Sequence, residues 1–150
     1  MPKSVVSFLN AVANQAGYEV FDSLYGSINL GEAFPITQSS GAVYGIWVQA
    51  DQPPRNDLSC IPGYQSWYPV YWGKDISPMS RMKAHVQGHQ NGNINLPNVV
   101  EVRGKALIYG AILVSRYWEF EQLLYRDYRP MLGSPAEGRR STIVQVKNGA

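Results

Sequence analysis

The sequence predicts an α/β domain of the α+β kind, in which a small, mostly antiparallel three-stranded sheet is flanked by helices. Short runs of β-branched and aromatic residues predict the strands, and apolar residues at helical spacing predict the helices. The chain has 150 residues, 45% of them hydrophobic, which suits one globular domain with a sizeable core. We divide it into an N-terminal helical extension (1–40), a core (41–133) and a basic C-terminal tail (134–150).

The N-terminal extension is predicted to pack on the core. Residues 4–16 carry an apolar stripe with helical spacing, for which Ser4 is the expected N-cap and Gly17 the expected end. Residues 18–36 are interrupted by glycines and fit no single type of element.

The core is predicted to begin with a strand over residues 42–50, where β-branched and aromatic residues are dense. Residues 51–69 contain four prolines and are predicted to form a long loop, followed by a second short strand over 70–72. Ser77 and Pro78 then predict the start of a helix that ends at Gly88.

The second half of the core is predicted to hold one more strand and one more helix. The valines of residues 98–109 favour a strand, whereas Gly110 suits the end of a helix, so both readings stay open. Residues 111–114 are predicted to form the third strand. Ser115 is the expected cap of a helix over 116–128, which Pro130 stops.

Charge, cysteine content and hydropathy exclude several classes of protein. The formal net charge is only +2, so contact with nucleic acid must depend on where the basic residues lie. Cys60 is the sole cysteine, which rules out an internal disulfide or a cysteine zinc cluster and leads us to expect a cytoplasmic protein. The longest apolar stretch, 106–114, is far shorter than the roughly 20 residues of a membrane span, so no membrane partner is expected.

One segment collects residue types that bind phosphate. Tyr71 leaves a strand, Gly73 permits a tight turn, and Lys74 sits on that turn. Arg81 and His85 lie four residues apart on the predicted helix and therefore share a face. Each residue alone is more often structural, but a tyrosine, a lysine, an arginine and a histidine aimed at one place indicate a phosphate site.

Glu121 is a second candidate for function. On the predicted 116–128 helix it shares a face with three tyrosines. A carboxylate on such a face costs free energy unless it is hydrogen-bonded, paired or bound to a cation, so Glu121 is either a satisfied structural residue or a metal ligand. Glu119 points elsewhere and is expected to pair with Arg116 at the surface.

These residues together resemble the motifs of the GIY-YIG nuclease family. The family's second motif, Tyr-x-Gly followed by Lys, matches residues 71–74, and Arg81 and His85 follow at the family's spacing of ten residues and then four. The family's glutamate segment matches residues 121–130, with Tyr125 in place of an isoleucine.

The first motif of the family is matched by residues 42–44, which end in Tyr44, and residues 45–47 form a competing alignment. The resemblance spans roughly residues 41–133 and implies a GIY-YIG-like fold. It implies that Tyr44 and Tyr71 flank the nucleophilic water, and that one of them, helped by Lys74 or His85, is the general base. A tyrosine has an ordinary pKa of about 10, so a nearby cation would have to lower it.

The same resemblance implies the rest of the machinery. Arg81 would bind the scissile phosphate, and Glu121 would hold a Mg²⁺ or Mn²⁺ ion, with water in most other coordination positions. The implied activity is metal-dependent endonucleolytic hydrolysis of DNA. The residues themselves do not distinguish DNA from RNA.

Substrate contacts are expected outside these motifs. The 51–69 loop offers Arg55 for a base edge or phosphate, and Tyr64 and Trp67 for stacking on bases. Alternatively, this loop packs its own aromatic rings against the protein. Further candidates for contacts to backbone phosphates are Lys83, Arg139 and Arg140.

Several biological roles would suit such a nuclease. It could be a compact restriction enzyme or a mobile-element or phage nuclease, and a sequence-specific cutter would be expected to act as a homodimer. The alternatives are an antibacterial toxin nuclease domain, which would have an inhibitor protein as partner, and a non-catalytic nucleic-acid-binding module. The presence of both Arg81 and Glu121 favours an enzyme.

Overall fold

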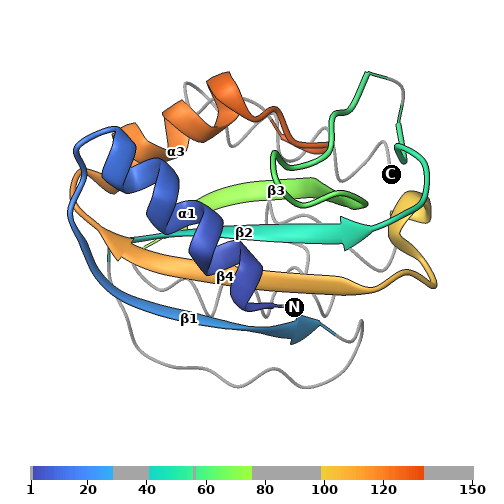
Figure 1. Ribbon diagram of the computed structural model, residues 1–150, viewed down its shortest axis with the longest axis horizontal. Coiled ribbons are helices and arrows are strands. Elements are labelled where there is room, and N and C mark those ends of the chain that lie inside the picture. Colours follow the sequence, from blue (N-terminus) through green and yellow to red (C-terminus); the bar gives the residue numbers. More distant parts are fainter. Residues whose placement is uncertain (1, 29–40, 56, 76–98, 134–150) are drawn as a thin grey trace.

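The computed structural model of the protein describes residues 2–28, 41–55, 57–75 and 99–133 (Figure 1). The predicted α+β class is confirmed. The helix predicted after Ser77 and the basic tail lie outside the described residues. The elements in chain order are α1 (Lys3–Gln15), β1 (Val20–Ile28), β2 (Ala42–Gln49), β3 (Trp67–Asp75), the 3-10 helix η2 (Val100–Val102), β4 (Leu107–Val114) and α3 (Tyr117–Asp127).

The sheet has four strands in the order β1-β4-β2-β3, and all neighbouring strands are antiparallel. The prediction of three strands was therefore wrong, because β1 lies inside the segment that we predicted as a helical extension. Most side chains of β1 are exposed or half-buried. Of its residues only Ile28 is buried, so the alternating hydrophobic pattern expected of a strand is weak in this segment.

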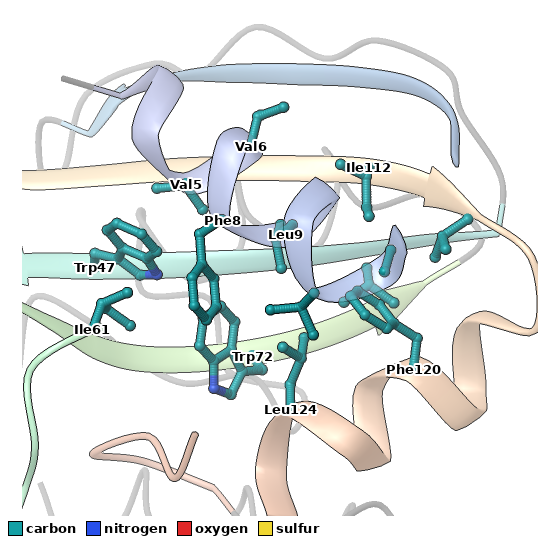
Figure 2. Packing of buried hydrophobic residues seen from close by; sticks show 14 of the residues in the cluster. Val5, Val6, Phe8, Leu9, Trp47, Ile61, Trp72, Ile112, Phe120 and Leu124 are labelled. Atoms are coloured by element: carbon teal, nitrogen blue, oxygen red, sulfur yellow. The ribbon is translucent and has the colours of Figure 1, made fainter. Parts of the chain in front are cut away.

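Helices α1 and α3 lie on one face of the sheet (Figure 1). Phe8 of α1 is the centre of this layer, with its ring stacked on Trp72 of β3 at a centroid distance of 6.0 Å. The same ring meets the edge of Trp47 of β2 at 5.7 Å. Figure 2 shows Leu124 of α3 near Phe8 and Trp72, with Phe120 further along the same cluster, so this apolar layer ties both helices to the central strands.

The opposite face of the sheet carries a second core cluster. It contains Tyr44, Ile46 and Val48 of β2, and the strands are covered there by residues from η2 and from the segment after α3. Both faces of β2 are therefore buried, which explains why its sequence reads as a continuous apolar run.

The outer edge of β3 is covered by the chain that follows α3. The amides of Met131 and Leu132 donate to the carbonyls of Pro69 and Val70 at 2.8 and 2.9 Å. An uncovered edge strand would present unpaired backbone groups to other chains. The covered edge also accommodates Pro69, which the sequence pattern suggested as part of a loop, because a proline is tolerated in an edge strand.

Two predicted helix caps were wrong, although the helices were right. Ser4 is buried inside α1, which begins at Lys3 without a side-chain cap. The hydroxyl of Ser115 accepts a hydrogen bond from the amide of Glu19 at 2.9 Å and so joins the two chain segments instead of capping α3. Gly17 follows the end of α1 as predicted, with a φ of 83° that favours glycine. Among the described helices, none is long and apolar enough to cross a membrane.

Candidate active site

Two of the predicted catalytic tyrosines lie beside each other on neighbouring strands. Tyr44 of β2 and Tyr71 of β3 have ring centroids 6.1 Å apart, and both rings are buried. A β-bulge at Val70 brings this about, since Ile46 pairs with Tyr71 whereas the next residue of β2 pairs with Pro69. The extra residue resets the alternation of side chains, so that Val70 and Tyr71 both belong to the cluster that contains Tyr44.

Gly73 makes room for Tyr44. The two residues are paired across the strands, and a Cβ atom on Gly73 would lie 2.4 Å from Cζ and 2.5 Å from the hydroxyl oxygen of Tyr44. We expected Gly73 to form a tight turn after the strand. Instead it lies within β3, and its function there is to let the phenol of Tyr44 lie across the strand.

Lys74 and Glu121 form an ion pair beside this strand. The Nζ atom of Lys74 lies 3.3 Å from Oε1 of Glu121 on α3. The side chain of Glu121 is 8% exposed and that of Lys74 is 34% exposed. Burial of an uncompensated carboxylate is costly, so the ammonium group helps to offset the cost of burying Glu121. The predicted surface pair of Glu119 with Arg116 is also present, at 3.8 Å.

A third tyrosine, Tyr125, connects α3 to the tyrosine pair. Its hydroxyl donates a hydrogen bond of 2.6 Å to the backbone carbonyl of Trp72, and its ring is buried. Burial raises the pKa of Tyr125 well above the usual value for a phenol, and the nearby Tyr71, Glu121 and Tyr44 raise it further. Tyr125 therefore keeps its proton at neutral pH and is a hydrogen-bond donor.

The structure thus brings four of the six predicted catalytic residues to one short stretch of β3. These are Tyr44, Tyr71, Lys74 and Glu121. Arg81 and His85 lie outside the described residues, as do three predicted phosphate contacts, Lys83, Arg139 and Arg140. Sequence reasoning did not include Tyr125, although its position on the same helical face as Glu121, one turn later, was a usable signal.

One carboxylate at this place, that of Glu121, is of the chemical kind that could hold a Mg²⁺ or Mn²⁺ ion. Within the described ranges, no group of three or more His, Cys, Asp or Glu side chains lies close enough to hold a metal by itself. Mg²⁺ needs fewer protein ligands than such a group, because it keeps several waters and is often held by one or two carboxylates together with substrate phosphates. Glu121 can supply that carboxylate, and Lys74 would compete with the ion for it.

The predicted substrate-binding residues of the long loop have mainly structural contacts. Arg55 donates to Glu101 of η2 at 2.7 Å and to the carbonyl of Met131 at 3.2 Å. Trp67, predicted to stack on bases, is the first residue of β3 and is buried, so little of its ring is exposed. Tyr64 is half-buried with its ring 5.5 Å from that of Trp47. The loop packs its aromatic rings against the core, which was the alternative interpretation.

A cleft of about 250 Å³ lies between the loop and the end of α3. It is lined on the loop side by Asp57 and Cys60 and on the helix side by Arg126 and Arg129, among others. Arg126 is already paired with Asp127 at 2.9 Å.

Comparison of the chain with models of protein families, with curated proteins and with solved structures finds no match.

Proposed function

We propose that the protein is a metal-dependent endonuclease of the GIY-YIG type that hydrolyses phosphodiester bonds in DNA. The observation that supports this proposal most strongly is the assembly of Tyr44, Tyr71, Lys74 and Glu121 around one stretch of β3. These residues come from two strands and a helix that are distant in sequence, and each matches a position of the motifs described above.

In this proposal the tyrosines handle the attacking water. Tyr44 or Tyr71, ionised to the phenolate with help from Lys74 or His85, would orient the water and accept its proton, whereas Tyr125 is excluded as a base because it holds its own proton too tightly. Lys74 is the most exposed described member of the cluster, and its positive charge favours a phosphate oxygen at the open side of the site.

Glu121 is the proposed metal ligand, and a bound Mg²⁺ would supply charge stabilisation at the phosphate and the leaving oxygen. The buried position of the carboxylate fixes its direction, which favours one defined place for a cation. Arg81, whose role rests on the sequence resemblance, would add a second positive charge.

Cleavage of supercoiled plasmid DNA with and without Mg²⁺ tests the proposal. The wild-type protein should nick or linearise the plasmid only with the metal, and Glu121→Gln and Arg81→Ala should each lower the rate by at least about 100-fold, which is about 2.7 kcal/mol of transition-state stabilisation. Glu119→Gln is the matched control, because Glu119 lies on the same helix in an exposed ion pair. Undiminished cleavage in EDTA, or by Glu121→Gln, would refute the mechanism. Metal-independent DNA binding without any cleavage would indicate a binding module.

A further inference from the structure

Trp118 is an exposed tryptophan on the helix that carries Glu121. The other three tryptophans of the chain, Trp47, Trp67 and Trp72, are buried, whereas 51% of Trp118 is exposed. Trp118 precedes Glu121 on α3 by three residues, which is about 4.5 Å along the helix axis and about 60° around it. The indole and the Glu121 carboxylate therefore start from neighbouring positions on one side of α3.

The contacts of α3 show towards which end of β3 this tryptophan lies. Tyr125 donates to the carbonyl of Trp72, and Glu121, one turn earlier on the helix, pairs with Lys74, which comes later on the strand. Trp118 is nearer still to the start of α3. It therefore lies beside the end of β3, on the far side of the Lys74–Glu121 pair from Tyr125.

Tyr117 anchors the indole at this place. Its ring meets that of Trp118 in a T-shaped contact, with a centroid distance of 5.0 Å and an angle of 82° between the planes. Tyr117 is itself half-buried and packs against Gly41, since a Cβ atom on that glycine would lie 3.5 Å from Cδ1 of the tyrosine. Gly41 directly precedes β2, whose first residue, Ala42, pairs with Asp75 at the end of β3, and α3 begins over this end of β2 (Figure 1). Because an edge-to-face contact orients aromatic rings, Trp118 presents an oriented ring beside the end of β3.

An exposed aromatic ring next to a positive charge matches the two parts of a nucleotide. The ammonium group of Lys74 attracts a phosphate, and the exposed indole of Trp118 offers a flat apolar surface on which a nucleobase can stack. A base reaches such a surface when it is unpaired or turned out of the duplex. Phe21 and Tyr25 are also exposed, but they lie on β1 at the opposite edge of the sheet. Of these three rings, only that of Trp118 lies on an element of the candidate site.

We propose that Trp118 is a substrate-binding residue, on which one unpaired or extruded base of the DNA stacks beside the phosphate held at Lys74. This inference rests on the proposed nuclease function. It adds that the substrate is single-stranded DNA, or duplex DNA with a base turned out of the stack at the site. Trp118 contributes to the affinity for the substrate and takes no part in the transfer of protons or in metal binding.

Binding in EDTA tests the stacking without any cleavage. The probes are a short single-stranded DNA of mixed sequence and its abasic analogue, which has the same deoxyribose-phosphate backbone without bases. Fluorescence anisotropy of the labelled probes should show that Trp118→Ala weakens binding of the DNA by about 5- to 150-fold, as expected for the loss of one stacked base. Binding of the abasic analogue should change by less than about twofold, because it has no base to stack. Equal losses on both probes, or a wild type that does not prefer the DNA to the abasic analogue, would overturn the proposal.

Two variants exclude other causes of weaker binding. Trp118→Phe retains a flat ring and should bind the DNA within about threefold of the wild type, whereas an affinity as low as that of Trp118→Ala would contradict stacking. Phe21→Ala removes a ring that is 66% exposed at the opposite edge of the sheet, and it should bind as the wild type does. An equal loss in Phe21→Ala would overturn the assignment to Trp118.

The salt dependence of binding separates stacking from charge. Trp118→Ala should leave the slope of log K against log salt unchanged, because the number of neutralised phosphates is the same, and an altered slope would contradict the proposal. Sedimentation of the same variants tests the other use of an exposed ring. If Trp118→Ala converts a dimer into a monomer and binds DNA as tightly as the wild type, Trp118 is a contact between two copies of the chain and the proposal is wrong.

Plasmid cleavage keeps this inference distinct from the nuclease proposal. A wild type that binds DNA through Trp118 but cleaves no plasmid with Mg²⁺ would refute the nuclease and retain the stacking site. Cleavage by the wild type, together with undiminished DNA binding by Trp118→Ala, would refute the stacking site alone.

Discussion

Replacing Gly73 with alanine tests the placement of Tyr44 in the site. The new Cβ would lie 2.4 Å from Cζ of Tyr44, whereas ordinary contact begins at 3.4 Å, so the ring would have to move by about 1 Å. Tyr44 is fully buried and has no open space to enter. Overpacking of this kind typically costs about 1–3 kcal/mol of unfolding free energy. A shift of about 1 Å in a reacting group can lower kcat by roughly 100-fold.

Gly45→Ala is the matched control for this substitution. Its Cβ would lie 2.4 Å from Cζ3 of Trp72, an overlap of the same size, but against the aromatic layer under α1 and not against Tyr44. Urea unfolding should show a comparable loss of stability in both variants. Plasmid cleavage, measured where both are folded, should fall much further in Gly73→Ala. Equal cleavage rates per folded molecule would show that the position of Tyr44 does not matter for the reaction.

Three further predictions concern the ion pairs and the loop. Lys74→Met should lower the unfolding free energy by about 1–3 kcal/mol, because it leaves the Glu121 carboxylate without its ammonium partner. Mn²⁺ should then raise the Tm of this variant more than that of the wild type. An equal metal-induced shift in both proteins would contradict competition between Lys74 and the metal for Glu121. The hydrogen bond from Arg55 holds the pKa of Glu101 below its usual 4.5. Glu101→Gln should therefore lower the unfolding free energy by less than about 1 kcal/mol at neutral pH, and this difference in stability from the wild type should vanish as the pH falls through the lowered pKa. A difference that persists in urea titrations at about pH 3 would contradict the prediction. Shortening residues 52–58, which leaves the buried aromatic residues in place, should weaken DNA binding or blur any sequence preference while metal binding is retained. Cleavage of a random-sequence library by the wild type and by the shortened variant measures this. Identical cleavage patterns of the two proteins would identify the loop as a connector.

The sequence was most informative where side chains are buried in a regular pattern. Helix α1, helix α3 and strand β2 were predicted within a residue or two, because each buries a stripe or both faces against the core. Strand β1 could not be found in this way, since it is held mainly by backbone pairing with β4 and exposes large residues such as Phe21. Backbone hydrogen bonds leave no trace in the identity of the side chains.

In the candidate site, too, the sequence predicted which side chains take part but not how the backbone places them. Motif spacing identified four residues of the candidate site, namely Tyr44, Tyr71, Lys74 and Glu121. It could not show that Tyr44 and Tyr71, which are separated by an odd number of residues, lie on the same face of the sheet. That depends on the bulge at Val70, a feature of pairing between strands. The structural role of Arg55 was also beyond the sequence, because its partner Glu101 is 46 residues away.

The segment after α3 covers the outer edge of β3, so the candidate site can assemble only when that segment is present. A fragment that stops before residue 117 would contain both tyrosines of the pair and Lys74, but it would lack Glu121, Tyr125 and the amides of Met131 and Leu132 that occupy the outer edge of β3. Strand β3 would then offer unpaired carbonyls to any neighbouring chain. Nascent chains and proteolytic fragments of this protein should therefore self-associate through this edge, and the residues around β3 come together only when the last described segment has docked.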